Sequence, residues 1–191
     1  MKPGTIVYTG KTEKGTDVSI RYPKLSDAAE MLRYINTLSK EETFILFQGE
    51  QLTISEETKF VRTLVKKIKE SKIVTLLVFH NDMLIGNSGI TMKEKAEKHV
   101  GDFGISIAKE FRGQGIGKLL MKFVLEQGEQ HLDNFEICTL GCFSDNTCAM
   151  EMYKKFGFQP FGSLPKGIRH KGIYVDHIFL YKIMNPVHEK T

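Results

Sequence analysis

The stretch Phe111-Arg112-Gly113-Gln114-Gly115-Ile116-Gly117-Lys118 decides the fold of this chain. It follows a segment that alternates like a strand, and from Ile116 onward apolar residues recur at helical spacing. Three alternating glycines therefore remove side chains from the backbone where a helix begins. The first N–H groups of a helix lack intrahelical acceptors and lie at the positive end of its dipole. The stretch predicts an anion-binding turn, to which Arg112 and Lys118 add positive charge.

Three phosphate-binding patterns compete for this stretch. A P-loop requires Gly at position 112 and Ser or Thr at position 119, where this chain has Arg112 and Leu119. A dinucleotide-binding fingerprint requires its third glycine where Lys118 stands. The pyrophosphate loop for coenzyme A (CoA), R/Q-x-x-G-x-G/A, is met by Arg112, Gly115 and Gly117. Taken alone, such a turn can also be a tight connection without a ligand.

A second informative segment lies downstream. Residues 135–142 read as a buried strand, and Ser144-Asp145-Asn146 follows as a cluster of helix-capping residues. A short helix comes next, and Gly157 is typical of the glycine that ends a helix. The apolar stripe of this helix consists of Ala149, Met152, Tyr153 and Phe156. The segment predicts a strand, a capped helix and a further strand from Phe158.

The two segments together resemble the GNAT acetyltransferase family. The pieces that carry the resemblance are residues 112–117 and the pattern Asn146-x-x-Ala149-x-x-x-Tyr153-x-Lys155-x-Gly157-Phe158, in the family's order and separation. The resemblance covers roughly residues 72–183. It implies an α/β (α+β) fold with three α/β/α layers and a mixed, mostly antiparallel central sheet. Two neighbouring strands, residues 99–107 and 135–142, are expected to splay apart and admit acetyl-CoA.

The resemblance also implies which residues contact acetyl-CoA, the expected co-substrate. Backbone groups of residues 105–107 would face the pantetheine arm, and residues 113–118 would hold the pyrophosphate. Asn146 would bond to the pantetheine, and Tyr153 would stand near the sulfur. The expected cofactor-binding residues are Ile105, Ser106, Ile107, Arg112, Gly113, Gln114, Gly115, Ile116, Gly117, Lys118 and Asn146.

The implied reaction is direct transfer of the acetyl group to a primary amine of a small molecule or a protein, without a metal. The amine must be neutral to attack the thioester. At pH 7 this costs about 4–5 kcal/mol for a lysine-type amine and about 1–1.4 kcal/mol for an α-amine. A base is therefore needed, and an acid can protonate the departing thiolate. A backbone N–H at the strand bulge can support the oxyanion.

Tyr153 is the expected general acid, although its place in a helix stripe also suits packing of its ring. Asp102 is the candidate base, because it matches the position of a catalytic glutamate in acetyltransferases resembling the phosphinothricin type. It fits a solvated strand residue at least as well. Another group of relatives has a glutamate where this chain has Gly141, a departure from the peptide-type catalytic site. His99, acting through water, is the alternative base.

Two segments near the expected site have open interpretations. The apolar residues within residues 43–50 could line an acceptor pocket, but packing in a core or a dimer seam is the favoured interpretation. A homodimer is therefore one option. The basic residues 166–172 are expected to form a loop before the last strand. This loop could meet the CoA 3′-phosphate or an acidic substrate, and exposure to solvent alone is favoured.

The chain has 191 residues, of which 41% are apolar and 26% charged, and this suits one globular domain. We expect a single N-acetyltransferase domain over residues 1–184. Residues 1–71 would supply an N-terminal hairpin and acceptor-side helices, and residues 72–184 the core that binds acetyl-CoA. Residues 185–191 are expected to form a frayed tail.

Composition argues against several other classes of protein. A formal charge of +4 suits an anionic small molecule and is too small to indicate nucleic acid as a partner. No window approaches the ~18 apolar residues of a membrane span. Three cysteines without a C-x-x-C pair indicate reduced thiols and a cytoplasmic protein. Six scattered histidines without H-E-x-x-H indicate no metal site. The alternative function is a non-catalytic regulatory module that binds CoA or acyl-CoA.

Overall fold

The computed structural model describes residues 1–184, and the tail expected at residues 185–191 lies outside the described residues. The strands are β1 (Ile6–Lys11), β2 (Asp17–Arg21), β3 (Ile73–His80), β4 (Met83–Met92), β5 (Val100–Ile107), β6 (Ile137–Phe143), β7 (Gln159–His170) and β8 (Ile173–Ile183). The helices are α1 (Ala28–Lys40), α2 (Ile54–Lys69), α3 (Ile116–His131) and α4 (Thr147–Lys155). Short 3₁₀ turns lie at Leu25–Asp27, Lys95–Glu97 and Lys109–Phe111.

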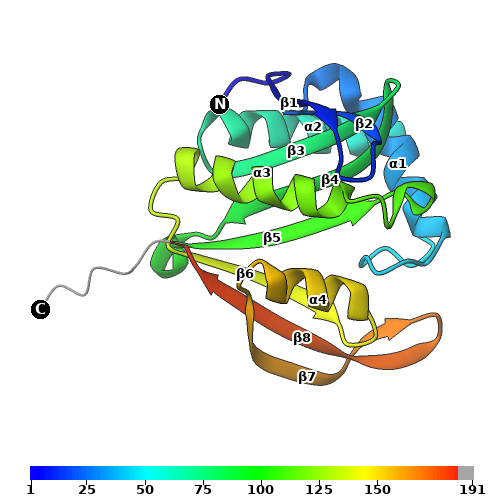
Figure 1. The fold of residues 1–191 in the computed structure, drawn as a ribbon, viewed down its shortest axis with the longest axis vertical. Coiled ribbons are helices and arrows are strands. Elements are labelled where there is room, and N and C mark those ends of the chain that lie inside the picture. The colour runs from blue at the N-terminus through cyan, green and yellow to red at the C-terminus, as the bar shows by residue number, and fades with distance from the viewer. Residues whose placement is uncertain (185–191) are drawn as a thin grey trace, which may run out of the picture.

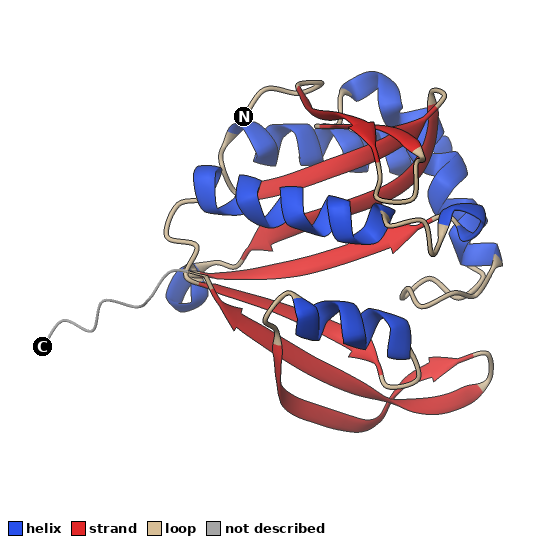
Figure 2. Ribbon diagram, in the orientation of Figure 1, coloured by secondary structure: helices blue, strands red, loops and turns tan. Residues whose placement is uncertain are grey.

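The described strands form one eight-stranded sheet in the order β1-β2-β3-β4-β5-β6-β8-β7 (Figure 1). Among these strands only β5 and β6 run parallel, and they pair over just Val100–Asp102 and Ile137–Thr139. Beyond this short ladder the two strands diverge, as Figure 2 shows. Helices α3 and α4 cover one face of the sheet, and α1 and α2 cover the other (Figure 1). The expected mixed, mostly antiparallel sheet, splayed at this place, is confirmed.

Phe135 fixes the point from which β5 and β6 diverge. Its ring is 2% exposed and lies just before β6. A Cβ atom added to Gly101 of β5 would lie 2.8 Å from the Phe135 ring, and one added to Gly128 of α3 would lie 3.0 Å from it. The two glycines therefore leave room for the ring between strand and helix. Close packing at this end holds the two strands together while their other ends separate.

The basic segment at residues 166–172 is not the expected loop. Its residues up to His170 belong to β7, and Ile168–His170 pair with Ile173–Val175 of β8. Only Lys171 and Gly172 form the turn, with φ of 49° and 78°. Two left-handed residues in a row make the tight turn that suits the twist of a two-stranded hairpin. The sequence pattern missed this because a charged, glycine-containing run resembles a loop.

We expect Phe135→Ala to lower the free energy of unfolding by about 3–5 kcal/mol, because it removes a fully buried ring between two glycines that cannot fill the cavity. Chemical denaturation followed by circular dichroism measures this change. Phe60→Ala is the matched control, since Phe60 is 53% exposed, and it should cost less than about 1 kcal/mol. Equal losses in the two variants would contradict the assigned role of Phe135.

Candidate functional site

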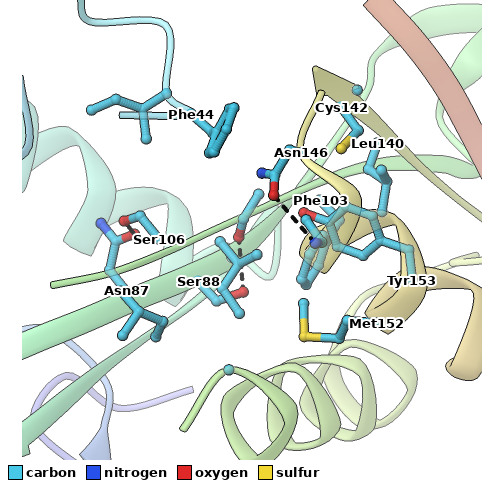
Figure 3. A pocket seen from close by; sticks show the side chains of 18 of the residues that line it. Phe44, Asn87, Ser88, Phe103, Ser106, Leu140, Cys142, Asn146, Met152 and Tyr153 are labelled. Atoms are coloured by element: carbon cyan, nitrogen blue, oxygen red, sulfur yellow. Dashed lines mark hydrogen bonds between the residues drawn. The ribbon is translucent and has the colours of Figure 1, made fainter. Parts of the chain in front are cut away.

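A cleft of about 1280 Å³ opens where β5 and β6 separate. Its walls come from β4, β5, β6 and α4, from the glycine-rich turn before α3, and from the segment between α1 and α2. Figure 3 shows Asn87 and Ser106 on one side, Asn146 and Tyr153 on the other, and Phe44 at a further edge. The cleft is large enough for an extended ligand with several functional groups.

The edge of β5 forms one wall of the cleft. Its ladder with β6 ends at Asp102, whereas its other edge stays paired with β4 as far as Ile107. The backbone groups of residues 103–107 that face β6 therefore have no strand partner, and an extended ligand with amide groups could pair with them as an added strand would. The expected residues 105–107 all line the cleft.

The side chain of Ser106 points into a separate polar network. Its hydroxyl lies 3.0 Å from the Tyr34 hydroxyl and 3.1 Å from Asn87 Oδ1, to which it donates. Tyr34 is 3% exposed, and burial raises the pKa of its phenol. This network anchors β5 to α1 and β4, so the Ser106 hydroxyl is already engaged. The backbone of Ser106 pairs with Asn87 of β4, and the main-chain groups of Ile105 and Ile107 face the open edge.

The glycine-rich turn brings backbone to the cleft. Gly113 and Gly115 have φ of 74° and 81°, a conformation that disfavours other residues, and Gly117 lies in the first turn of α3. All three line the cleft. Two other expected residues turn their side chains elsewhere. Gln114 accepts a 2.7 Å hydrogen bond from Thr16, and Ile116 is 1% exposed in the core. These two can contribute only main-chain groups.

Both cations of this stretch line the cleft and already have carboxylate partners. Arg112 donates to Glu41 at 2.8 Å and to the carbonyl of Ile107 at 3.0 Å. Lys118 Nζ lies 3.8 Å from Glu13. Glu41 ends α1 and Glu13 lies in the β1–β2 turn, so both pairs join distant parts of the chain to the turn. Exposed pairs such as these are weak, and a phosphate could exchange with the carboxylates.

Asn146 and Tyr153 lie on the opposite wall of the cleft. Asn146 caps the start of α4, and Tyr153 lies within this helix. Asn146 Oδ1 accepts from the N–H of Ala149 at 3.2 Å, which caps the helix and leaves the amide NH₂ available. Tyr153 is 6% exposed, and its ring meets Phe103 of β5 edge-on at 6.2 Å. Burial raises the pKa of the Tyr153 phenol, with a smaller contribution from the Cys142 thiol. The phenol therefore keeps its proton at neutral pH.

Asp102 lies on the opposite face of β5 from Phe103, because neighbouring strand residues alternate between faces. Its carboxylate accepts a hydrogen bond from the hydroxyl of Thr139 on β6, and both residues line the cleft at the last rung of the ladder. The alternative base, His99, precedes β5 and is not among the residues that line the cleft. The structure thus brings Asp102 to the site and leaves His99 outside it.

Sequence reasoning missed His177 of β8, which also lines the cleft. Its imidazole lies over Gly141: a Cβ atom there would lie 2.1 Å from His177 Nε2. The ring centroid is 4.3 Å from that of Phe179, and burial lowers the pKa of the imidazole. The available signal was the alternation along β8, which places His177, Phe179 and Tyr181 on one face.

The segment between α1 and α2 lines the cleft rather than a closed core. Thr43, Phe44, Ile45 and Leu46 all face it, so the favoured packing interpretation was incomplete. Phe44 contacts Phe143 and His170, with ring centroids 5.7 and 4.8 Å apart. His170 Nε2 lies 2.8 Å from the carbonyl of Glu42 and fastens the segment to β7.

Two kinds of feature are absent from residues 1–184. No three His, Cys, Asp or Glu side chains there gather in a way that could hold a metal ion. None of the helices in this part of the chain combines the length and the apolar character that crossing a membrane requires.

Known proteins resemble this chain in both sequence and fold. The model of the acetyltransferase (GNAT) family matches residues 35–158. An L-amino acid N-acetyltransferase of Escherichia coli (strain K12) is 29% identical over 103 residues, a match that covers 52% of this chain and 62% of that relative. The chain therefore aligns with about 62% of the length of this curated relative.

Solved structures share the fold over most of the chain. A GNAT-family acetyltransferase from Streptococcus pneumoniae superposes with a TM-score of 0.77 and 28% identity, covering 87% of this chain and 99% of that one. A putative acetyltransferase from Salmonella typhimurium, solved with its cofactor acetyl-CoA, gives a TM-score of 0.76 and 13% identity, covering 88% and 95%. At the lower identity the likeness concerns the fold alone.

We expect Gly117→Val to weaken binding of CoA at least about tenfold, a change of about 1.4 kcal/mol. The new side chain would stand at the mouth of the turn, where a Cβ lies 3.5 Å from Met152 Sδ. Valine has a higher helix propensity than glycine, so the melting temperature of the variant should not fall. Calorimetric titration with CoA measures the affinity. Gly162→Val on β7 is the control, and an unchanged affinity in Gly117→Val would contradict the location of the phosphate.

Proposed function

Because this chain belongs to the acetyltransferase (GNAT) family, we propose that it transfers the acetyl group of acetyl-CoA directly to a primary amine of a small molecule or a protein. The observation that carries the proposal is the cleft at the open edge of β5, which ends at the bare amides of the glycine-rich turn. Such a cleft suits a ligand with peptide-like amides at one end and a pyrophosphate at the other. Acetyl-CoA supplies the activated acetyl thioester.

The residues proposed to hold the co-substrate fall into two groups. Main-chain groups of residues 105–107, with the Asn146 amide, would meet the pantetheine arm. Main-chain N–H groups of residues 113–118 would bind the pyrophosphate. Arg112 and Lys118 would exchange their carboxylate partners, Glu41 and Glu13, for the phosphates and neutralise the phosphate charge. The Salmonella typhimurium protein described above, solved with acetyl-CoA, supports this use of the fold.

Tyr153 is the proposed general acid. Its ring packs against Phe103 on the α4 side of the opening, and burial keeps its phenol protonated. A protonated hydroxyl beside the sulfur can give its proton to the departing thiolate. Asp102 lies on the other face of the sheet, and there we propose that its carboxylate attracts the ammonium group of the acceptor.

We also propose that the protein works in a reducing compartment such as the cytoplasm. Cys138, Cys142 and Cys148 are free thiols. Burial raises the pKa of Cys138 to about 12 and that of Cys142 to about 11. These two thiols stay protonated and pack in the core, on the same face of β6.

The test is a screen of amines for release of free thiol from acetyl-CoA. The panel contains L-alanine, L-methionine, the dipeptide Ala-Gly, spermidine and Nα-acetyl-lysine, and the L-amino acids are included because of the curated relative. Amine-dependent release supports the proposal. Binding of acetyl-CoA without release by any amine would overturn it in favour of a non-catalytic regulatory module. Absence of binding would overturn both.

We expect Tyr153→Phe to lower kcat about 100-fold or more, since it removes the proton donor and keeps the ring. Affinity for CoA should not change. Wild-type activity should show no loss between pH 7 and about 10 from ionisation of Tyr153, because burial raises the pKa of the phenol. Steady-state kinetics across pH measure both effects. Tyr181→Phe on β8 is the control. A wild-type kcat in Tyr153→Phe would contradict the role of Tyr153 as general acid.

A further inference from the structure

We propose that His177 is the base that takes the proton from the acceptor amine, an inference that rests on the proposed acetyl transfer. His177 projects from β8 over Gly141 of β6, beside the opening between β5 and β6. Its place in the sheet puts it on the face that also carries Thr139, opposite the face where Tyr153 packs. Acid and base would therefore stand on opposite sides of the opening through which an amine meets a thioester.

The absence of a side chain at Gly141 makes this placement possible. A Cβ atom at this position would lie 2.1 Å from His177 Nε2 and 3.0 Å from Cε1, so any other residue would displace the ring. Gly141 has φ in the ordinary negative range and does not need to be glycine for its backbone. We infer that the glycine is there to let the imidazole lie against β6.

The imidazole is available to accept a proton. Within residues 1–184, neither ring nitrogen of His177 has a hydrogen-bond or ion-pair partner. The neighbours of its side chain are apolar. They are Phe179 on the same strand and Leu164 and Gly167 on β7. Burial lowers the pKa of His177 below the ordinary value of 6.5, so the ring is neutral at pH 7.

The strands around His177 carry several charged groups, among them Lys166 and Arg169 on β7 and Lys182 on β8. Asp176 on β8 accepts from the backbone N–H of Lys166 at 2.9 Å. His170 on β7 is held by Asp145 and the carbonyl of Glu42. On β6 the ionisable groups are the buried thiols of Cys138 and Cys142, which alternate with Gly141 and face away. Asp102 on β5 accepts from Thr139. None of these side chains is hydrogen-bonded to the imidazole.

His177 takes one proton from the ammonium group of the acceptor, which leaves a neutral amine and an imidazolium. The amine nitrogen forms a bond to the thioester carbonyl carbon, the C–S bond breaks, and the second proton of the nitrogen is lost. Tyr153 delivers one proton to the thiolate, and the second nitrogen proton restores the Tyr153 phenol through solvent. His177 releases its own proton to water. The sum is an amide, a free thiol and one proton.

A base of this kind favours a particular class of acceptor. Measured from the ordinary imidazole value, the pKa gap to an α-ammonium group is about 1.5, whereas the gap to a lysine-type ammonium is about 4. Burial of His177 widens both gaps. Peptide N-termini, represented by the dipeptide Ala-Gly, should therefore be better acceptors than spermidine or Nα-acetyl-lysine in the panel.

The experiment compares kcat for the wild type and for His177→Ala with the best amine of the panel. At pH 7 we expect a loss of about 100- to 1000-fold. At pH 9.5, where the α-amine of a peptide such as Ala-Gly is largely neutral without help, the loss with that acceptor should shrink below about tenfold. Wild-type kcat should fall as the pH drops below about 6.5, and the variant should lack this limb. His131→Gln, an exposed histidine at the end of α3, is the control.

Two further measurements separate catalysis from a structural role. Added imidazole should restore part of the activity of His177→Ala, because the cavity above Gly141 can admit it. Gly141→Ala should reproduce the loss by displacing the ring, and combining it with His177→Ala should add little. Melting temperatures and CoA affinity check that each variant is folded. A pH-independent loss without imidazole rescue would overturn the inference.

A measurement without any acceptor amine tests the role of His177 independently of the thiol-release screen. Nuclear magnetic resonance of histidine-labelled protein should show that acetyl-CoA moves the His177 ring signal more than CoA does, and leaves His131 unchanged. Equal signals with both compounds would overturn the assignment of His177 even if thiol release is observed. Failure of every amine to release thiol overturns the proposed function, whereas wild-type behaviour of His177→Ala overturns this inference alone.

Discussion

The loss of pairing between β5 and β6 is the constraint on which the site depends. Three residues of each strand form a parallel ladder, and beyond Asp102 the strands separate. A backbone edge inside a sheet normally has a partner, because unpaired amides are costly when buried. Here the edge faces a cleft of about 1280 Å³, where a ligand can supply the partners. The packing of Phe135 against Gly101 and Gly128 holds the closed end of this opening.

The sheet divides the site into two sides. On one face α3 and α4 supply bare amides, a capped helix and the buried phenol of Tyr153. On the other face, Asp102 and Thr139 share a hydrogen bond, and His177 lies over Gly141. The opening between β5 and β6 connects the two sides. In the proposed acetyl transfer, an amine would approach the thioester from the face opposite the one proposed to bind the rest of the co-substrate.

Several contacts tie the segments around the cleft to distant parts of the chain. Arg112 bonds to Glu41 at the end of α1, and Gln114 bonds to Thr16 near the β1–β2 turn. His170 holds the segment after α1 through the carbonyl of Glu42. Each contact joins residues that are distant in sequence and involves a segment that lines the cleft or directly adjoins it. The walls of the site are therefore braced by pairs from separate elements.

The sequence by itself determined the local parts of this protein. Glycines at 113, 115 and 117, and the cap at Asn146, define their turns and helix ends through backbone conformation and hydrogen bonds within a few residues. The family resemblance supplied the mixed, mostly antiparallel sheet and the two strands that separate. The basic segment at residues 166–172 was misread because hairpin pairing depends on the register with β8.

Only the tertiary structure decided which distant side chains meet. His177 and Gly141 are brought together by the β6–β8 register, and a shift of one residue would turn the imidazole to the other face. The Arg112–Glu41 pair spans 71 positions. Such contacts depend on the packing of whole elements, whereas propensity and periodicity report only on neighbours along the chain. The glycine at 141 was visible in the sequence, and the ring that fills its space was not.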